Sequence, residues 1–188
     1  MKFALCLLLA TLLYAGISRP VTYQGYDSLL QQKALEHFPD DPEAWHWIKA
    51  KVYCESGFKA DAVSRVGARG LMQIMPRTAQ DLGGNSTRAL DPKWAIDAGT
   101  RYTRMLWQYF PYVEDRTSRR ALTDASYNSG IGNVLKASLA TQRLGGDKRR
   151  WWGGVRNHLV TRPASIKETT DYVDRICYFT KKLALSDR

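Results

Sequence analysis

One carboxylic acid of this chain has a setting that suits proton transfer. Trp45, Ile48 and Val52 follow steps of three and four residues, so they share one face of a helix. Glu55 continues the same steps and closes this apolar stripe. Partial desolvation there disfavours the carboxylate, and a pKa raised by about two units from about 4.3 corresponds to about 2.7 kcal/mol. Such an acid can donate a proton near neutral pH, whereas the alternative is an ordinary solvated glutamate at a helix end.

Groups that could hold a metal or a cofactor form no pattern in the sequence. The histidines, His37, His46 and His158, are scattered, and Cys54 and Cys177 lack the paired spacing of a zinc site. No glycine-rich phosphate loop is present. The sequence therefore predicts no metal and no cofactor.

The element that positions Glu55 is the first clear helix. It is expected to open at Asp41-Pro42-Glu43, with Asp41 as the N-cap and Pro42 at the first helical position, and to end at Gly57. Residues 61–75 suit turns and short extended pieces, with at most a small hairpin.

Glycines and prolines divide the rest of the chain into further helical stretches. These are expected over residues 76–82, 91–110, 118–127, 134–140 and 168–185, with Ser118 as one N-cap and a basic loop or insertion over 143–162. The inward stripe of the 91–110 helix is expected to be Trp94, Ala98, Tyr102, Met105 and Tyr109, and that of the last helix Val173, Ile176, Thr180 and Leu183. The fold class predicted is mainly α, with a small β-hairpin region.

An apolar leader precedes the globular part. Lys2 is followed by a nearly uninterrupted apolar run over residues 3–15 and then by Gly16 and Ser18, as in a secretory signal peptide. The run is shorter than the roughly 20 apolar residues of a typical bilayer span, and an uncleaved membrane anchor is the alternative. The leader could also contact the membrane transiently. The expected organisation is a signal peptide (1–18), an N-terminal extension (19–41) and one catalytic domain (42–188).

Export would leave Cys54 and Cys177 as an even pair in an oxidising compartment. A disulfide and two buried free thiols remain equally open, because the sequence does not give the Cα separation that a bridge requires. Loss of the leader would also leave 27 basic against 18 acidic residues, a net charge of +9. Such a charge speeds encounter with nucleic acid, anionic lipid or an anionic cell wall alike, so charge does not choose among them.

Three short segments stand in an order that carries a resemblance. They are ESGF at 55–58, GLMQI at 70–74 and SYNSG at 126–130, accompanied by AVS at 62–64, GAR at 67–69, Asp91-Pro92, Glu168-Thr169 and Tyr172-Val173. Together they resemble the soluble lytic transglycosylase family of the lysozyme-like superfamily, over most of the chain that follows the leader. Two departures are Ser126, where alanine is usual in the family, and Cys54, where glutamine is common.

The resemblance implies a lysozyme-like α+β fold and cleavage of the MurNAc-GlcNAc β-1,4 bond of peptidoglycan without water. Most glycosidases pair two carboxylates. Here Asp61 and Asp124 are the candidates for a second one, and each is more simply a turn or helix-surface residue. The family's solution is that the substrate's N-acetyl group assists departure and its 6-hydroxyl attacks the anomeric carbon. Glu55 would serve first as acid and then as base, and would leave a 1,6-anhydro-MurNAc end.

The resemblance also implies supporting residues. Those matched to substrate binding are Ser56, Met72, Gln73, Tyr127, Asn128, Glu168 and Tyr172. Four of these residues have structural alternatives: a helix-end cap for Ser56, a helix C-terminus packing on its turn for Tyr127 and Asn128, and an ordinary exposed acid for Glu168. Leu71 and Ile74 are expected in the core. The Arg149-Arg150-Trp151-Trp152 insertion has no family counterpart and could bind sugars and anions or simply pack a loop.

The partners expected are peptidoglycan glycan strands, with no nucleic acid and a monomeric state. The expected location is exported, in the periplasm, at the cell wall or in a virion. A hydrolytic lysozyme of the same superfamily, a noncatalytic wall-binding or virion structural protein, and a nucleic-acid binder are the competing hypotheses. The sequence does not choose between wall turnover, secretion-system assembly and a phage role, nor between endo and exo action.

Overall fold

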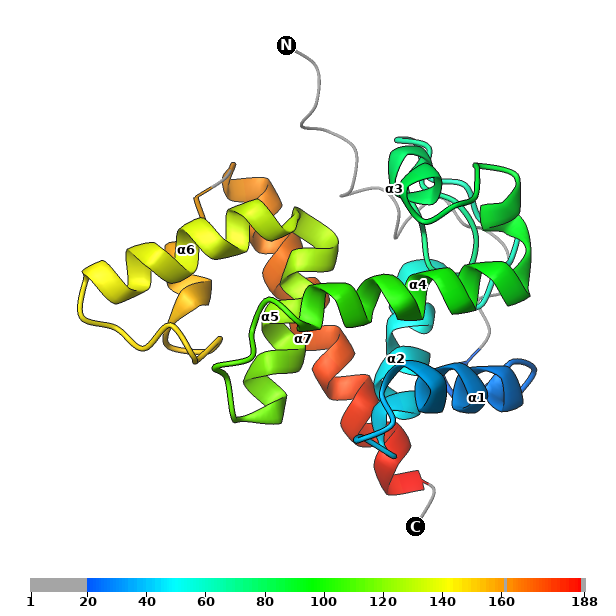
Figure 1. Cartoon of the computed structure of the whole chain (residues 1–188), viewed down its shortest axis with the longest axis horizontal. Coiled ribbons are helices and arrows are strands. Elements are labelled where there is room, and N and C mark those ends of the chain that lie inside the picture. The colour runs from blue at the N-terminus through cyan, green and yellow to red at the C-terminus, as the bar shows by residue number, and fades with distance from the viewer. Residues whose placement is uncertain (1–19, 161, 187–188) are drawn as a thin grey trace. The chain divides into compact units, whose positions relative to one another are not determined.

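The computed structural model describes residues 20–160 and 162–186, and these form a mainly helical structure (Figure 1). The leader expected at residues 1–18 lies outside the described residues. In order, the elements are α1 (Asp27–His37), α2 (Ala44–Ser56), α3 (Pro76–Asp81), the 3-10 helix η1 (Arg88–Leu90), α4 (Pro92–Trp107), α5 (Arg116–Ser129), α6 (Ile131–Arg143), the 3-10 helix η2 (Val155–His158) and α7 (Pro163–Ser186). None of these helices is long and apolar enough to span a membrane.

The small β region expected over residues 61–75 is present in reduced form. Arg69 forms isolated antiparallel bridges with Val63 and with Ile74, and residues 61–75 contain no strand longer than these single bridges. Glycines at positive φ, among them Gly67 at 88° and Gly70 at 73°, let the chain reverse direction at short intervals here. The predicted fold class, mainly α with a small β-hairpin region, is confirmed.

The described chain divides into two compact parts. We call residues 20–102 and 178–186 the Glu55 part and residues 103–177 the Asn128 part. Along the chain, α4 and α7 each continue from one part into the other.

Helix α1 of the Glu55 part lies within residues 19–41, the expected N-terminal extension, for which no helix is predicted from the sequence. It has no capping side chain, and its apolar residues do not form a strong stripe. Leu30 and Ala34 are nevertheless buried, and α1 packs on α2, where the Lys49 ammonium lies 2.7 Å from Asp27. Tertiary packing therefore stabilises a helix that local propensity does not predict.

Helix α2 ends as predicted and begins later than predicted. Gly57 is left-handed, with φ of 58°, and its N–H donates to the carbonyl of Tyr53. The start is corrected: Asp41-Pro42-Glu43 forms a turn in which the Asp41 carbonyl accepts the Ala44 N–H at 2.9 Å, and the helix begins at Ala44.

Two residues of the stripe predicted for α4 are exposed. Met105 is 47% exposed, and Tyr109, which is 53% exposed, lies beyond the end of the helix at Trp107. Ala98 is buried as predicted, and the other buried residues of α4 lie at neighbouring positions, among them Ile96, Thr103 and Leu106. In α7 the expected inward residues Val173, Ile176 and Leu183 are buried.

In the Asn128 part, the N-cap of α5 is Asp115 and not Ser118. The Asp115 carboxylate accepts the backbone N–H of Ser118 at 2.8 Å and that of Thr117 at 3.4 Å, so Ser118 lies in the first turn. Helix α5 runs to Ser129, and Gly130, at φ of 87°, separates it from α6.

The insertion that contains Trp151 and Trp152 packs as a loop against α7. Trp151 is fully buried, and the Trp152 indole donates to Asp174 of α7 at 2.9 Å. Arg156 lies 3.0 Å from the other oxygen of the same carboxylate. Of the two expectations for this segment, packing accounts for both tryptophans, while Arg149 and Arg150 remain exposed.

Cys54 and Cys177 are each half-buried in the described structure. Cys54 belongs to the Glu55 part and Cys177 to the Asn128 part, so a disulfide and two thiols stay alternative predictions.

Positive charge is unevenly divided between the parts. The Asn128 part has 13 basic and 7 acidic residues, a net +6, whereas the described residues of the Glu55 part have 12 basic and 10 acidic residues, a net +2.

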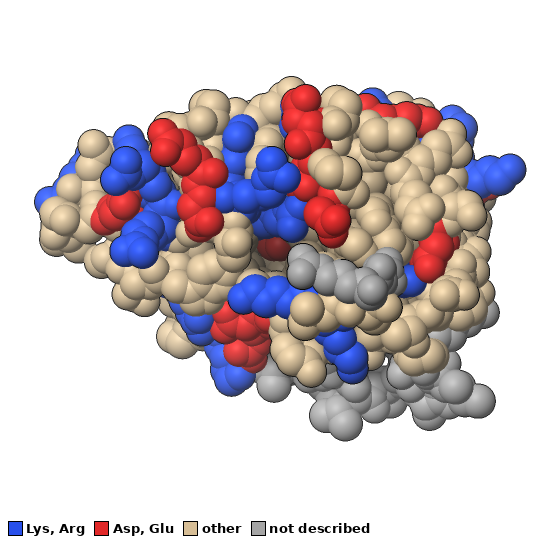
Figure 2. Space-filling model, turned by 90° about the horizontal axis from the view of Figure 1, so that it is seen from below, with Lys and Arg blue, Asp and Glu red and all other residues tan. Residues whose placement is uncertain are grey.

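On the face drawn in Figure 2, red acidic groups lie among the blue basic ones. The charge on that face is therefore mixed in sign, unlike the continuous basic surface typical of nucleic-acid binders.

The Asp115 cap gives a stability test. Asp115→Ala removes the acceptor for two backbone N–H groups and should lower the free energy of unfolding by about 1 kcal/mol in denaturant titrations. Hydrogen bonds from Ser118 lower the pKa of Asp115 in the folded chain. Its contribution is therefore present above the unfolded-state pKa and is lost as the pH falls through the folded-state pKa. Asp115→Asn should keep most of the capping interaction without this pH dependence. If Asp115→Ala were as stable as the wild type, Asp115 would not stabilise the start of α5.

Candidate functional site

Glu55 lies in the last turn of α2, half-buried, immediately before a sharp reversal of the chain. Gly57 and Phe58 both adopt left-handed backbone conformations, with φ of 58° and 63°. For a bulky residue such as phenylalanine this conformation is rare and strained, and surrounding structure must impose it. The reversal directly after Glu55 is therefore held by tertiary contacts.

Aromatic rings supply those contacts. Phe58 is fully buried, and its ring centroid lies 5.8 Å from that of Tyr53 and 5.5 Å from that of Tyr23. Phe179 meets the Tyr53 ring edge-on at 4.7 Å. Tyr23 precedes α1, so a residue of the N-terminal extension helps to hold the turn beside Glu55.

Ser56 joins the end of α2 to the second motif. Its hydroxyl lies 3.0 Å from the Leu71 carbonyl oxygen and 3.2 Å from that of Val52, within hydrogen-bond distance of both. This geometry agrees with the helix-end alternative for Ser56. A direct contact with substrate stays a prediction.

The second motif packs tightly on η1 and α4. At Gly70 a Cβ atom would stand 1.8 Å from the Ala89 carbonyl oxygen, so only glycine fits there. Gln73 is half-buried at φ of 45°, and its amide nitrogen donates to the carbonyls of Gly70 at 3.0 Å and Ala62 at 3.3 Å. These two hydrogen bonds fix the orientation of the Gln73 side chain. No described residue donates to its amide oxygen, so that oxygen remains available as an acceptor.

Met72 is placed in the core rather than on a groove wall. It is fully buried and packs on Gly99 of α4, where a Cβ would lie 2.7 Å from the Met72 methyl group. A side chain without exposed surface cannot lie against a glycan, which corrects the expectation for Met72. Met75, which is 42% exposed, is the accessible thioether of this segment. The sequence interpretation missed it, although it follows the motif directly.

Leu71 and Ile74 are buried, which confirms the core positions predicted for them.

Within the Asn128 part, the structure brings together two predicted site residues that are 40 positions apart. The Asn128 amide nitrogen lies 3.4 Å from Oε1 of Glu168 on α7, and the Thr169 hydroxyl donates to the Asn128 amide oxygen at 2.8 Å. Both Asn128 and Glu168 are half-buried. Burial raises the pKa of Glu168, and the hydrogen bond from Asn128 opposes that rise.

The tyrosines of this part differ in exposure. Tyr127 is half-buried in α5, whereas Tyr172 is only 8% exposed on α7. Tyr172 therefore has little surface with which to meet a ligand in this conformation.

The two acids considered as second carboxylates lie in contrasting environments. Asp61 is exposed in a turn, as expected. Asp124 is 2% exposed, so its assignment to the helix surface was wrong: it lies on the inner face of α5.

A cluster of possible metal ligands is already occupied by a cation of the chain. Single ligand atoms of Glu36, His37 and Asp97 lie within 4.8 Å of one another. The Lys33 ammonium stands 2.6 Å from the Glu36 carboxylate and 3.2 Å from that of Asp97, so it neutralises the acids that a metal would need. The donor set therefore fits an ion-pair network better than a metal centre.

The contact between Tyr23 and Phe58 predicts a local stability effect. Tyr23→Ala should lower the free energy of unfolding by about 2 kcal/mol, because it leaves a cavity beside a strained, buried ring. Amide exchange at Phe58 should accelerate in the same variant. Tyr23→Phe keeps the ring and should resemble the wild type, and Tyr26→Ala, whose ring contacts Tyr23 at 5.8 Å, is the matched control. Unchanged exchange at Phe58 in Tyr23→Ala would show that the tyrosine does not hold the turn.

Glu168 predicts a pH effect of opposite sign to that of Asp115. Its folded-state pKa is raised by burial, so the folded chain binds the proton more tightly than the unfolded chain does. Stability gained by protonation is present below the unfolded-state pKa and is lost as the pH rises through the folded-state pKa. Glu168→Gln should flatten the unfolding free energy across that window. An identical pH dependence in variant and wild type would show that burial does not shift this carboxyl.

Comparison with known proteins identifies relatives of the chain. The family model described as "Transglycosylase SLT domain" matches residues 41–149, more than half of the sequence. A protein of Alteromonas mediterranea named membrane-bound lytic murein transglycosylase F is 33% identical over 156 residues, which cover 82% of this chain and 33% of that protein. One of the same name from Cellvibrio japonicus is 38% identical over 107 residues, covering 57% of this chain and 21% of that protein.

Solved structures agree with these sequence matches. The 70 kDa soluble lytic transglycosylase of Escherichia coli superposes with a TM-score of 0.61 at 25% identity, covering 86% of this chain and 25% of that chain. A complex of the 70-kDa soluble lytic transglycosylase with bulgecin A gives a TM-score of 0.60 at 26% identity, covering 84% of this chain and 24% of that chain. This chain thus spans a third or less of the length of each of these relatives. By the extent of the family match, the chain belongs to the transglycosylase SLT domain family.

Proposed function

We propose that this protein is a peptidoglycan lytic transglycosylase in which Glu55 is the single catalytic acid and base. The observation that carries the proposal is the setting of Glu55, half-buried at the end of α2 and followed by a reversal that buried aromatic rings hold in place. A proton donor must be held rigidly to act, and this one lies inside the region that the family model matches. The names of the relatives support the same activity.

The reaction needs one carboxyl group that first donates a proton and then accepts another. Protonated Glu55 donates to the glycosidic oxygen as the bond from that oxygen to C1 of MurNAc breaks, and the substrate's N-acetyl group stabilises the electron-poor C1. The Glu55 carboxylate then accepts the proton of the C6 hydroxyl as O6 bonds to C1. The product is a 1,6-anhydro-MurNAc end, no water is consumed, and Glu55 is again protonated. Asp61 and Asp124 take no part in this scheme.

Substrate binding is assigned to polar groups that are positioned and still accessible. In the Glu55 part these are Gln73, through its amide oxygen, and Ser56, with Met75 as the thioether that can pack on a sugar face. In the Asn128 part they are Tyr127, Asn128 and Glu168, where the Asn128–Glu168 contact fixes an amide and a carboxyl together. Tyr172 of α7 also belongs to the residues assigned to substrate binding, although only 8% of it is exposed.

The closest competing function is hydrolysis, in which water captures the intermediate instead of O6. A nucleic-acid binder does not account for Glu55 and its turn, and a noncatalytic wall-binding or virion protein would not need them. We further propose an exported, monomeric protein that acts on glycan strands in the cell envelope, in agreement with the membrane-bound relatives.

Product analysis with Glu55→Gln tests the proposal. Wild-type protein digesting purified sacculi should release muropeptides with anhydro-MurNAc ends, identified by mass spectrometry. Glu55→Gln should fold normally and lose activity by about 10²–10⁴-fold, because the amide cannot donate the proton. Glu114→Gln, an exposed acid of the Asn128 part, is the matched control and should be fully active. Reducing MurNAc ends would establish a hydrolase, and an active Glu55→Gln variant would exclude this acid.

A further inference from the structure

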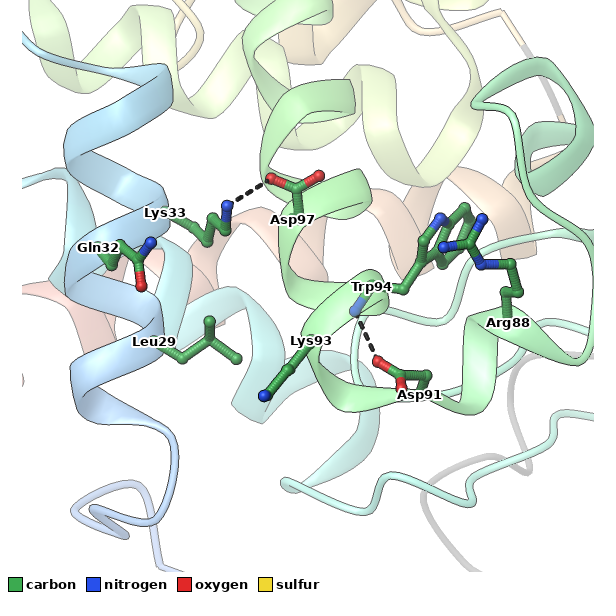
Figure 3. A pocket seen from close by; sticks show the side chains of 8 residues that line it. All are labelled: Leu29, Gln32, Lys33, Arg88, Asp91, Lys93, Trp94 and Asp97. Carbon is green, nitrogen blue, oxygen red and sulfur yellow. Dashed lines mark hydrogen bonds and ion pairs between the residues drawn. The ribbon is translucent and has the colours of Figure 1, made fainter.

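A groove of about 620 Å³ lies entirely within the Glu55 part, between α1 and the start of α4 (Figure 3). Leu29 and Lys33 of α1 line one side, and the other side comes from residues of η1 and α4 and from Asp91 between them. The volume is in the range of ligand-binding clefts. Helix α1 precedes the region matched by the family model, so one wall of this groove lies outside that region.

Ion pairs fix the separation of the two walls. The Lys33 ammonium of α1 lies 3.2 Å from the Asp97 carboxylate of α4, and His37 of α1 lies 3.1 Å from the same oxygen. Figure 3 shows the Lys33–Asp97 pair spanning from one helix to the other. These charges are already paired, so they hold the groove open in a defined shape rather than recruit a ligand.

Three charged side chains without an ion-pair partner among the described residues, Arg88, Asp91 and Lys93, lie around Trp94 in this groove. The Arg88 guanidinium lies over the Trp94 ring, 5.9 Å from its centroid, and has no carboxylate partner among the described residues. Lys93 has no ion pair within residues 20–160 and 162–186. Asp91 accepts the Trp94 N–H with one oxygen at 2.8 Å, which leaves its other oxygen available. In Figure 3, Asp91 lies between Arg88 and the Lys93 side chain, which extends toward Leu29.

This arrangement recognises a ligand that carries both signs of charge. Two cations can bind carboxylates, the Asp91 oxygen can accept from an ammonium group, and Trp94 with Leu29 can cover an aliphatic stem. A polyanion would meet the negative charge of Asp91, and a neutral glycan would leave Lys93 without an ion pair. A short peptide with several carboxylates and one free amine matches the whole set.

We infer that this groove binds the peptide stems of peptidoglycan, separately from the glycan on which Glu55 acts. The identity of the peptide rests on the proposed function, because the stem peptides of that polymer combine carboxylates with the amine of a diamino acid. Binding of one stem would recruit peptide-bearing strands and leave cleavage of the sugar bond itself unchanged. The interaction should be weakened by salt, since the groups involved are exposed.

The test uses the Glu55→Gln protein, so that no substrate is consumed, and the free tetrapeptide stem as the probe. Titration should shift amide resonances of α1, η1 and the first turn of α4. Lys93→Glu and Arg88→Gln should each weaken the affinity by about tenfold or more, as expected for loss of a charge-assisted hydrogen bond. Lys182→Glu, an equal charge change on the exposed end of α7, should leave it unchanged.

Two outcomes of the peptide titration would overturn the inference: no saturable binding of the tetrapeptide at millimolar concentration, or binding that Lys93→Glu and Arg88→Gln do not alter. Thermal melts of the variants establish that each is folded. The peptide-free disaccharide should not shift the groove resonances, and shifts there would assign the groove to the glycan instead. Anhydro-MurNAc release by the wild type is measured independently, so failure of this inference leaves the assignment of Glu55 standing, and failure of the proposed function is seen in the products rather than in the peptide titration.

Discussion

The left-handed turn after Glu55 is the constraint on which the rest of the Glu55 part depends. Phe58 occupies a backbone conformation that an L-residue rarely adopts, and burial of its ring among Tyr23 and Tyr53 offsets the strain. If the turn relaxed, α2 could extend, and the carboxyl group at its end would change direction. The second motif stabilises the same arrangement, because Ser56 contacts the Leu71 carbonyl and Gly70 fits directly against η1.

The Asn128 part achieves rigidity by hydrogen bonding instead. Asn128 bridges Thr169 and Glu168, so the end of α5 is fixed to α7 by one amide. A second fixed point on α7 is Asp174, which receives the Trp152 indole and Arg156 from the insertion. Polar groups that keep their hydrogen bonds are buried at a low cost in free energy. In this network Glu168 is partly shielded from water, and this burial raises its pKa.

The sequence could predict features that follow from local chemistry. The end of α2 at Gly57, the short helix after Pro76 and the buried face of α7 each follow from a glycine, a proline or a regular apolar spacing. Features set by tertiary packing could not be predicted in this way. Helix α1 has no cap and no strong stripe, and the burial of Met72 depends on the absence of a side chain at Gly99, far away in the sequence. The order of the motifs identified the candidate residues, but the structure was needed to distinguish the buried thioether of Met72 from the exposed one of Met75.

Helix α1 also bears on where this domain should be considered to begin. The family match starts at residue 41, but Leu30 is fully buried on α2, and Lys33 and His37 bind Asp97 of α4. A fragment cut at the family boundary would uncover apolar surface on α2 and leave the Asp97 carboxylate unneutralised. Recombinant versions trimmed to the shared homology region would therefore be prone to aggregate, and domain limits in comparable chains are better drawn from packing than from alignment.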